Sequence, residues 1–125
     1  MSFVAGETFL FPLGTRETPH LWIVSTTADA DGRFAIVSLT SLKGSKDQTV
    51  ILRAGEHPFI RWDTCVAYAL AELTSSEQLE DLINRGTAQR QAPLRSDLLR
   101  LIVDGFLGSD FTKKRISDFV RRARR

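Results

Sequence analysis

Residues 21–41 read LWIVSTTADADGRFAIVSLTS, and this stretch decides the expected fold. Two runs rich in β-branched and aromatic residues, 21–25 and 34–41, lie on either side of a polar segment that contains Asp31-Gly32. Asp-Gly is a favoured pair for the tight turn of a β-hairpin. The second run is almost continuously apolar, which is typical of a largely buried strand. We therefore predict two antiparallel strands joined by a turn.

Further strand signals lie on both sides of this hairpin. Residues 7–11 predict a first strand that Pro12 ends, and residues 14–20 have the turn chemistry and charges of a loop that reaches over a ligand. Two later segments, 49–52 and 65–71, read as further short strands. Five short strands that are joined by turns favour a compact antiparallel barrel over a parallel sheet.

Helical signals replace the strand pattern in the second part of the chain. Residues 74–77, Thr-Ser-Ser-Glu, form a capping box before an amphipathic stretch that ends at Gly86. A polar linker, residues 87–91, leads to Pro93 and to a leucine-rich helix that we expect to end before Gly105. The prediction is an α+β, mainly β chain in which about five strands are followed by two or three helices.

Size and composition indicate one soluble domain that spans residues 1–125. The apolar share of 42% and the charged share of 26% are ordinary for a globular chain. The single Cys65 cannot form an internal disulfide, so we expect a reducing, cytoplasmic compartment. No apolar run approaches the roughly 20 residues that span a bilayer, and the first residues lack the features of a signal peptide. We expect no contact with a membrane.

The charges are distributed unevenly along the chain. Residues 113–125 carry seven of the 17 Lys and Arg residues but one of the 15 Asp and Glu residues, which gives this segment +6 and the remainder −4. Apolar residues recur on one stripe of the same segment, so it predicts a basic amphipathic helix or tail. A basic end on an acidic body indicates a polyanion or an acidic partner protein, and it also fits a solvated helix without a specific role.

Residues 55–64, GEHPFIRWDT, contain several side chains that can take part in catalysis or ligand binding. His57 exchanges protons near neutral pH, Arg61 is a permanent cation, Asp63 is an acceptor and Trp62 offers a stacking face. Donors and a ring in one loop suit a nucleotide or phosphate ligand. The same residues are also compatible with a loop that only seals one end of a barrel.

Several common motifs are absent. The chain has no phosphate-binding loop, no dinucleotide fingerprint and no hydrolase elbow, so these chemistries have no support. With one cysteine, and with His20 and His57 far apart in the sequence, a metal site has little support either. We predict no metal and no cofactor.

The order of the segments resembles the PemK/MazF family of bacterial toxins. Residues 6–9, Gly-Glu-Thr-Phe, are similar to its opening strand, and residues 21–25 are similar to its apolar strand that ends in serine. Residues 36–41 resemble its strand that ends in Thr-Ser, and residues 63–66 lie where it often has Asp-Ser-Val-Val. The resemblance covers roughly residues 5–107. It implies a small SH3-like barrel and metal-independent cleavage of single-stranded RNA.

The resemblance also implies partners and a set of site residues. Members act as homodimers that an acidic antitoxin inhibits, so both partners are expected here. This chain has Pro19-His20 where the family commonly has Arg-Pro, so Arg16 or His20 would replace that arginine. Such cleavage needs a base, an acid and donors to the phosphate. The expected catalytic residues are His20, Thr40, His57 and Arg16, and the expected substrate-binding residues are Ser41, Lys43, Arg61, Trp62 and Asp63.

Two alternatives remain open at this point. His20 is as compatible with a residue that begins a strand as with a catalyst. His57 is as compatible with a residue that only hydrogen-bonds a loop carbonyl as with a catalyst. The same barrel is also compatible with a non-catalytic module that binds nucleic acid or protein.

Overall fold

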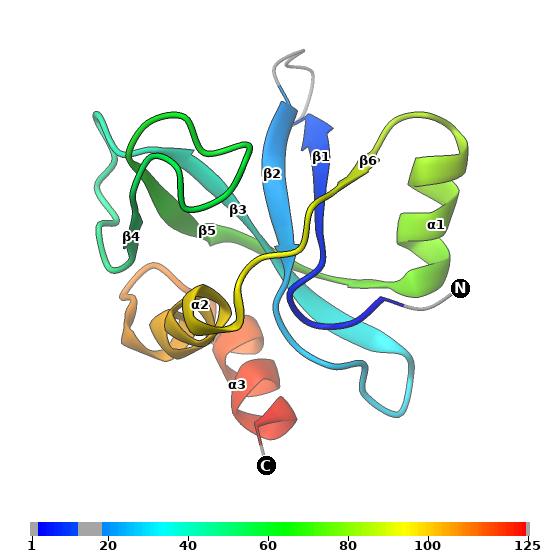
Figure 1. Cartoon of the computed structure of the whole chain (residues 1–125). Coiled ribbons are helices and arrows are strands. Elements are labelled where there is room, and N and C mark those ends of the chain that lie inside the picture. The colour runs from blue at the N-terminus through cyan, green and yellow to red at the C-terminus, as the bar shows by residue number, and fades with distance from the viewer. Residues whose placement is uncertain (1–2, 13–18, 125) are drawn as a thin grey trace.

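The structure, a computed structural model, describes residues 3–12 and 19–124. Six strands and three helices lie in this part of the chain (Figure 1). In order they are β1 (Thr8–Pro12), β2 (Pro19–Val24), β3 (Arg33–Ser41), β4 (Ile51–Leu52), β5 (Thr64–Ser75), α1 (Ser76–Asn84), β6 (Gln89–Gln91), α2 (Ser96–Gly108) and α3 (Lys114–Ala123). The predicted α+β class is confirmed.

The described strands form one antiparallel sheet in the order β4-β5-β3-β2-β1-β6. The sheet curls into half a barrel, and the irregular pairing of β3 with β5 accounts for the curl. From Ile36 to Ser38, β3 advances two residues, whereas the paired positions on β5 run from Glu72 to Ala67, which is five residues. Extra residues on one strand bend it and increase its twist.

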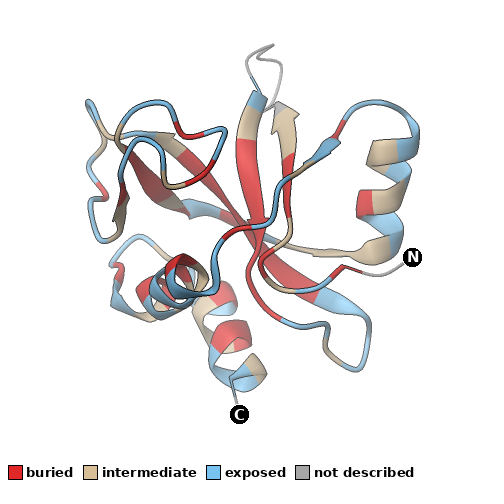
Figure 2. Cartoon of the chain, viewed as in Figure 1, coloured by how far each residue is buried: buried red, intermediate tan, exposed pale blue. Residues whose placement is uncertain are grey.

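The predicted hairpin forms the middle of the sheet. Its turn contains Gly32 with a φ of 78°, and the side chain of Asp29 accepts hydrogen bonds from the backbone N–H groups of Asp31 and Arg33 at 2.9 Å each. These bonds hold the pKa of Asp29 below its ordinary value, with the bond from Arg33 as the largest cause. β2 and β3 are then buried on both faces (Figure 2), as the nearly continuous apolar run of β3 predicts.

Alternate residues of these strands enter two different cores. Leu21, Ile23 and Val37 face the larger core, together with buried residues of α2 and α3. Trp22 and Val24 face the smaller core, together with Phe3 and the first helix. The side-chain period of two in a strand therefore supplies both faces of the sheet.

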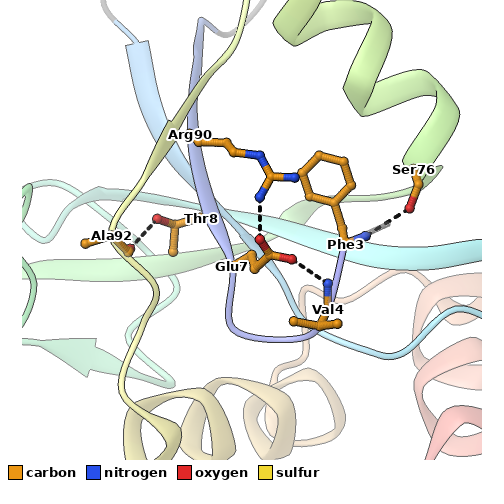
Figure 3. Close-up of polar contacts among 7 residues, drawn as sticks. All are labelled: Phe3, Val4, Glu7, Thr8, Ser76, Arg90 and Ala92. Carbon is orange, nitrogen blue, oxygen red and sulfur yellow. Dashed lines mark hydrogen bonds and ion pairs between the residues drawn. The ribbon is translucent and has the colours of Figure 1, made fainter. Parts of the chain in front are cut away.

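The sixth strand lies in the segment predicted as a polar linker, so the described sheet has one strand more than the approximate number of five that we predicted. β6 pairs with β1, Arg90 lying opposite Phe9, and polar contacts rather than apolar burial hold it. The guanidinium of Arg90 pairs with Glu7 and lies 4.1 Å from the ring centroid of Phe3 (Figure 3). Thr8 Oγ1 donates to the carbonyl of Ala92 at 2.7 Å. A strand held in this way has no hydrophobic period to reveal it.

The helix boundaries differ from the predictions in two places. Ser75 rather than Thr74 caps α1, accepting from the N–H of Gln78 at 3.2 Å, because β5 continues to residue 75. α2 runs past Gly105 to Gly108. Gly105 therefore lies inside the helix, where it is a point of close packing. No helix in residues 3–12 and 19–124 has the length and apolarity needed to cross a membrane.

The basic C-terminal segment forms α3, a helix that packs into the larger core. Ile116, Phe119 and Val120 are buried in that core. Two of its cations pair with acidic residues elsewhere on the chain: Arg115 pairs with Glu72 at 3.1 Å, and Arg124 pairs with Asp104 at 2.8 Å. The positive charge of this segment is therefore partly neutralised by the acidic body on which it folds.

Candidate functional site

Figure 1 shows where the start of β2, the end of β3 and the loop between β4 and β5 lie in the fold. The side chains of these three segments border a cleft. Its volume is about 440 Å³, within the range of small-ligand sites. The residues that line it are Pro19, His20, Leu21, Leu39, Thr40, Ser41, Phe59, Ile60, Arg61, Trp62 and Thr64. They come from the start of β2, from the end of β3 and from the β4–β5 loop with the first residue of β5.

Strand register brings His20 toward Thr40. Trp22 lies opposite Ser38, and this register extended by two residues puts His20 opposite Thr40. The ladder stops short of that pair, and His20 Nδ1 instead lies 3.1 Å from the carbonyl oxygen of Leu39. The imidazole therefore takes the place of a backbone bond where the two strands separate.

This contact fixes the tautomer of the imidazole. A carbonyl oxygen only accepts hydrogen bonds, so Nδ1 of His20 carries the proton and Nε2 carries the lone pair in the neutral ring. Nε2 has no hydrogen-bond partner among the residues that the structure describes. The basic nitrogen of this half-buried histidine is thus left without a protein partner in the described part of the chain.

The loop between β4 and β5, residues 53–63, is held by a network of short bonds. Gly55, with a φ of 90°, donates to the carbonyl of Ile60 at 2.8 Å, and the buried Ile60 side chain packs into the larger core. Asp63 accepts from the N–H of Ala54 at 3.2 Å and from the guanidinium of Arg53 at 2.9 Å. These bonds, the one from Ala54 first, hold the pKa of Asp63 below its ordinary value.

The rim of the cleft is aromatic and cationic. The exposed fractions of Phe59 and Trp62 are 37% and 62%, although both are large apolar side chains. Arg61 lies between them in sequence, is exposed and forms no ion pair within residues 3–12 and 19–124. Exposed rings beside a guanidinium suit the stacked bases and the phosphate of a single strand.

Five of the predicted site residues line this cleft: His20, Thr40, Ser41, Arg61 and Trp62. Three others lie outside its lining. Asp63 is engaged with Arg53, Lys43 is exposed on the β3–β4 connection, and His57 is buried behind the loop. Arg16 lies outside the described residues.

His57 has a structural position. Only 3% of the residue is exposed, and its Nε2 lies 2.6 Å from the carbonyl oxygen of Ala92, to which it donates. Its Nδ1 accepts from the N–H of Phe59 at 3.0 Å. Both ring nitrogens are thus used, and they join the rim of the cleft to the segment that follows β6. Ala92 also accepts from Thr8, so this single carbonyl ties the loop to β1.

Phe59 and Thr64 also line the cleft, although the sequence pattern does not predict them as site residues. Thr64 is 8% exposed, lies opposite Ser41 in the β3–β5 ladder and borders the cavity. Its Oγ1 is buried and has no hydrogen-bond partner among the described residues. The signal for Thr64 is its place at the start of a strand directly after the loop, but only the register with β3 turns that place into a site.

The described residues contain no group of three or more His, Cys, Asp and Glu side chains arranged to hold a metal. Cys65 is buried and has a free thiol. The chemistry of the cleft therefore comes from one imidazole, several hydroxyl groups, one guanidinium and two aromatic rings.

Comparison of the chain with models of protein families, with curated proteins and with solved structures gives no match.

Proposed function

We propose that the cleft binds single-stranded RNA and that the protein cleaves it as a toxin-like, metal-independent endoribonuclease. One observation carries the proposal: His20, whose Nε2 has no hydrogen-bond partner among the described residues, borders the same cavity as three hydroxyl-bearing residues, the Arg61 guanidinium and two exposed aromatic rings. RNA is the polymer that offers a phosphate, a base to stack and a nucleophile of its own.

The reaction needs a base near the ribose. Nε2 of His20 takes the proton of the 2′-hydroxyl, whose oxygen attacks the adjacent phosphorus. The bond from phosphorus to the 5′-oxygen breaks, and that oxygen leaves with a proton from solvent. The products are a 2′,3′-cyclic phosphate and a 5′-hydroxyl. Arg61 and the hydroxyl of Thr40 donate to the phosphate oxygens as negative charge develops.

A likeness to the PemK/MazF toxins is part of the proposal. Its support is the group of short motifs in residues 6–66 and the order of a curled antiparallel sheet followed mainly by helices. An SH3-like barrel, a homodimer and inhibition by an acidic antitoxin belong to the same proposal.

Cleavage of a short single-stranded RNA in the presence of a chelator tests the activity. We expect the wild type to leave a 2′,3′-cyclic phosphate and to spare an RNA with 2′-deoxyribose at the cleaved position. The variants H20A and T40A should each lose at least about 100-fold in rate. K46A is the matched control, because Lys46 is exposed and lies outside the cleft lining, and it should cleave like the wild type. Equal rates for H20A and wild type would contradict the proposed mechanism.

A second candidate is a module that binds single-stranded nucleic acid without cleaving it. It is favoured by the burial of His57, which leaves His20 as the single imidazole in the described cleft lining and supplies no second proton donor there. Salt-dependent RNA binding by the wild type with no product, together with weaker binding by R61Q and W62A, would support this candidate.

A further inference from the structure

The floor of the cleft is apolar. Leu21, Leu39 and Ile60 border the cavity and are at most 5% exposed. A phosphate would lose its hydration against such a surface and gain little in return. A flat heterocycle buries apolar faces there at a gain in free energy, as is usual in pockets with few polar groups.

One polar group among these apolar residues lacks a partner. Thr64 Oγ1 is buried and has no hydrogen-bond partner within residues 3–12 and 19–124, and a buried hydroxyl in that state lowers the stability of the fold. A threonine exchanges the positions of its hydroxyl and methyl groups when χ1 moves between staggered rotamers. A ligand with donors or acceptors on its edge can therefore supply the partner that the free protein lacks.

Charge and stacking groups lie at the mouth of the same cavity. Arg61 and Trp62 are exposed there, and His20 borders the same cavity. A nucleotide that enters with its base first leaves its phosphate at this cationic mouth. The next base along the strand then lies where the indole of Trp62 can stack on it.

We infer that the cavity is a subsite for one unpaired nucleobase, read at its edge by the hydroxyl of Thr64, with the adjoining phosphate held at the mouth by Arg61. This subsite rests on the proposed binding of single-stranded RNA and adds a specificity-determining residue to it. The base lies inside the cleft and the sugar-phosphate chain lies across its opening.

Abasic scanning of the ligand tests the subsite. The probe is a labelled short RNA with 2′-O-methyl riboses, which cannot be cleaved, and its affinity is measured by fluorescence anisotropy. Homopolymers first identify the preferred base, and abasic residues are then placed at each position in turn. We expect one position to cost at least about tenfold in affinity and the others to cost clearly less. Equal losses at every position would overturn the single-base subsite.

Substitution of Thr64 tests its role by a readout that a packing role would not produce. T64V keeps the shape and removes the hydroxyl, so its melting temperature should equal or exceed that of the wild type. Its affinity for the preferred homopolymer should nevertheless fall by about tenfold, and its discrimination among bases should weaken. T64S keeps the hydroxyl and should keep the base preference.

The outcomes separate the subsite from the wider proposal. Undiminished affinity and preference in T64V, with a wild type that binds RNA, would overturn the role of Thr64 alone. A wild type that binds no homopolymer would overturn RNA binding and the subsite together.

Discussion

The hydroxyl oxygen of Tyr68 lies 1.9 Å from the point that a β-carbon on Gly105 would occupy. The Tyr68 Cζ atom and the Val50 Cγ2 atom each lie 2.7 Å from the same point. Tyr68 donates to the carbonyl of Ile102, one turn earlier in α2, at 2.7 Å. α2 therefore packs this closely on β5 because residue 105 has no side chain.

Substitution of Gly105 by alanine should unfold or strongly destabilise the protein. The new methyl group would overlap Tyr68 and Val50, which are held in a packed core, so G105A should cost about 3 kcal/mol or more in urea denaturation. G108A is the matched control, because its β-carbon would meet Thr49 Cγ2 at an ordinary 3.8 Å. The control should be within about 1 kcal/mol of the wild type, in the stabilising direction. Equal effects of the two variants would contradict the close approach.

Alkaline pH should destabilise the folded protein through Tyr68. Burial, and then the charges of Asp47 and Asp104, raise the pKa of this phenol well above its ordinary value of 10.0. Above pH 10 the unfolded chain loses this proton while the folded chain keeps it, so stability should fall by about 1.4 kcal/mol per pH unit. Below pH 10 the phenol is protonated in both states and adds no pH dependence.

Phenolate absorbance measures this effect directly, because Tyr68 is the only tyrosine of the chain. The absorbance should rise together with the loss of the folded structure rather than at pH 10. Y68F should lack this part of the alkaline loss of stability. A phenolate signal at pH 10 in the folded protein would contradict the burial of the hydroxyl.

The fold follows from sequence where a hydrophobic period marks each element. The hairpin of residues 21–41 is of this kind, since its turn residues and apolar runs agree with each other. β6 is not, because pairing with β1 and the contacts of Arg90 hold a polar segment in the sheet. Local sequence rules predict that a helix ends at Gly105. The close contact with Tyr68, 37 positions earlier, instead explains why a glycine lies inside α2.

The site follows from sequence only in part, for a related reason. Residue types identify His20, Arg61 and Trp62 as capable of binding or proton transfer, and these residues do meet in one cleft. Residue type alone predicts a site role for His57 as well, although His57 is buried. It predicts no such role for Thr64, although Thr64 borders the cavity. Burial and strand register separate these two residues, and neither property is visible in a short motif.

Removal of residues 113–125 should abolish folding. It should not leave a folded domain that only lacks a basic tail. Ile116, Phe119 and Val120 are buried in the larger core, and full burial of each is worth about 1.5 to 3 kcal/mol. Their sum is comparable to the whole stability of a domain of this size. Circular dichroism of the truncated chain should show loss of native structure.

The matched control keeps the helix and removes charge from it. The double variant K113Q/R122Q changes two exposed cations and should retain the wild-type spectrum and melting temperature within a few degrees. A folded truncated chain would show that α3 is dispensable and would restore the interpretation of this segment as a separate basic tail.

Substitution of His57 distinguishes a positioning residue from a catalytic one. H57A removes the donor to Ala92 and the acceptor for the N–H of Phe59, and it leaves a cavity behind the loop, so it should cost about 2 to 3 kcal/mol of stability. H57Q can keep the bond to Ala92 and H57N can keep the bond from Phe59, so each should lose less stability than H57A.

Because His57 lies outside the cleft lining, folded H57Q should cleave RNA within a few-fold of the wild-type rate, whereas H20Q should be inactive. Inactive H57Q with wild-type stability would instead place His57 in the reaction, since only a direct role in proton transfer removes activity while the loop that it holds stays intact.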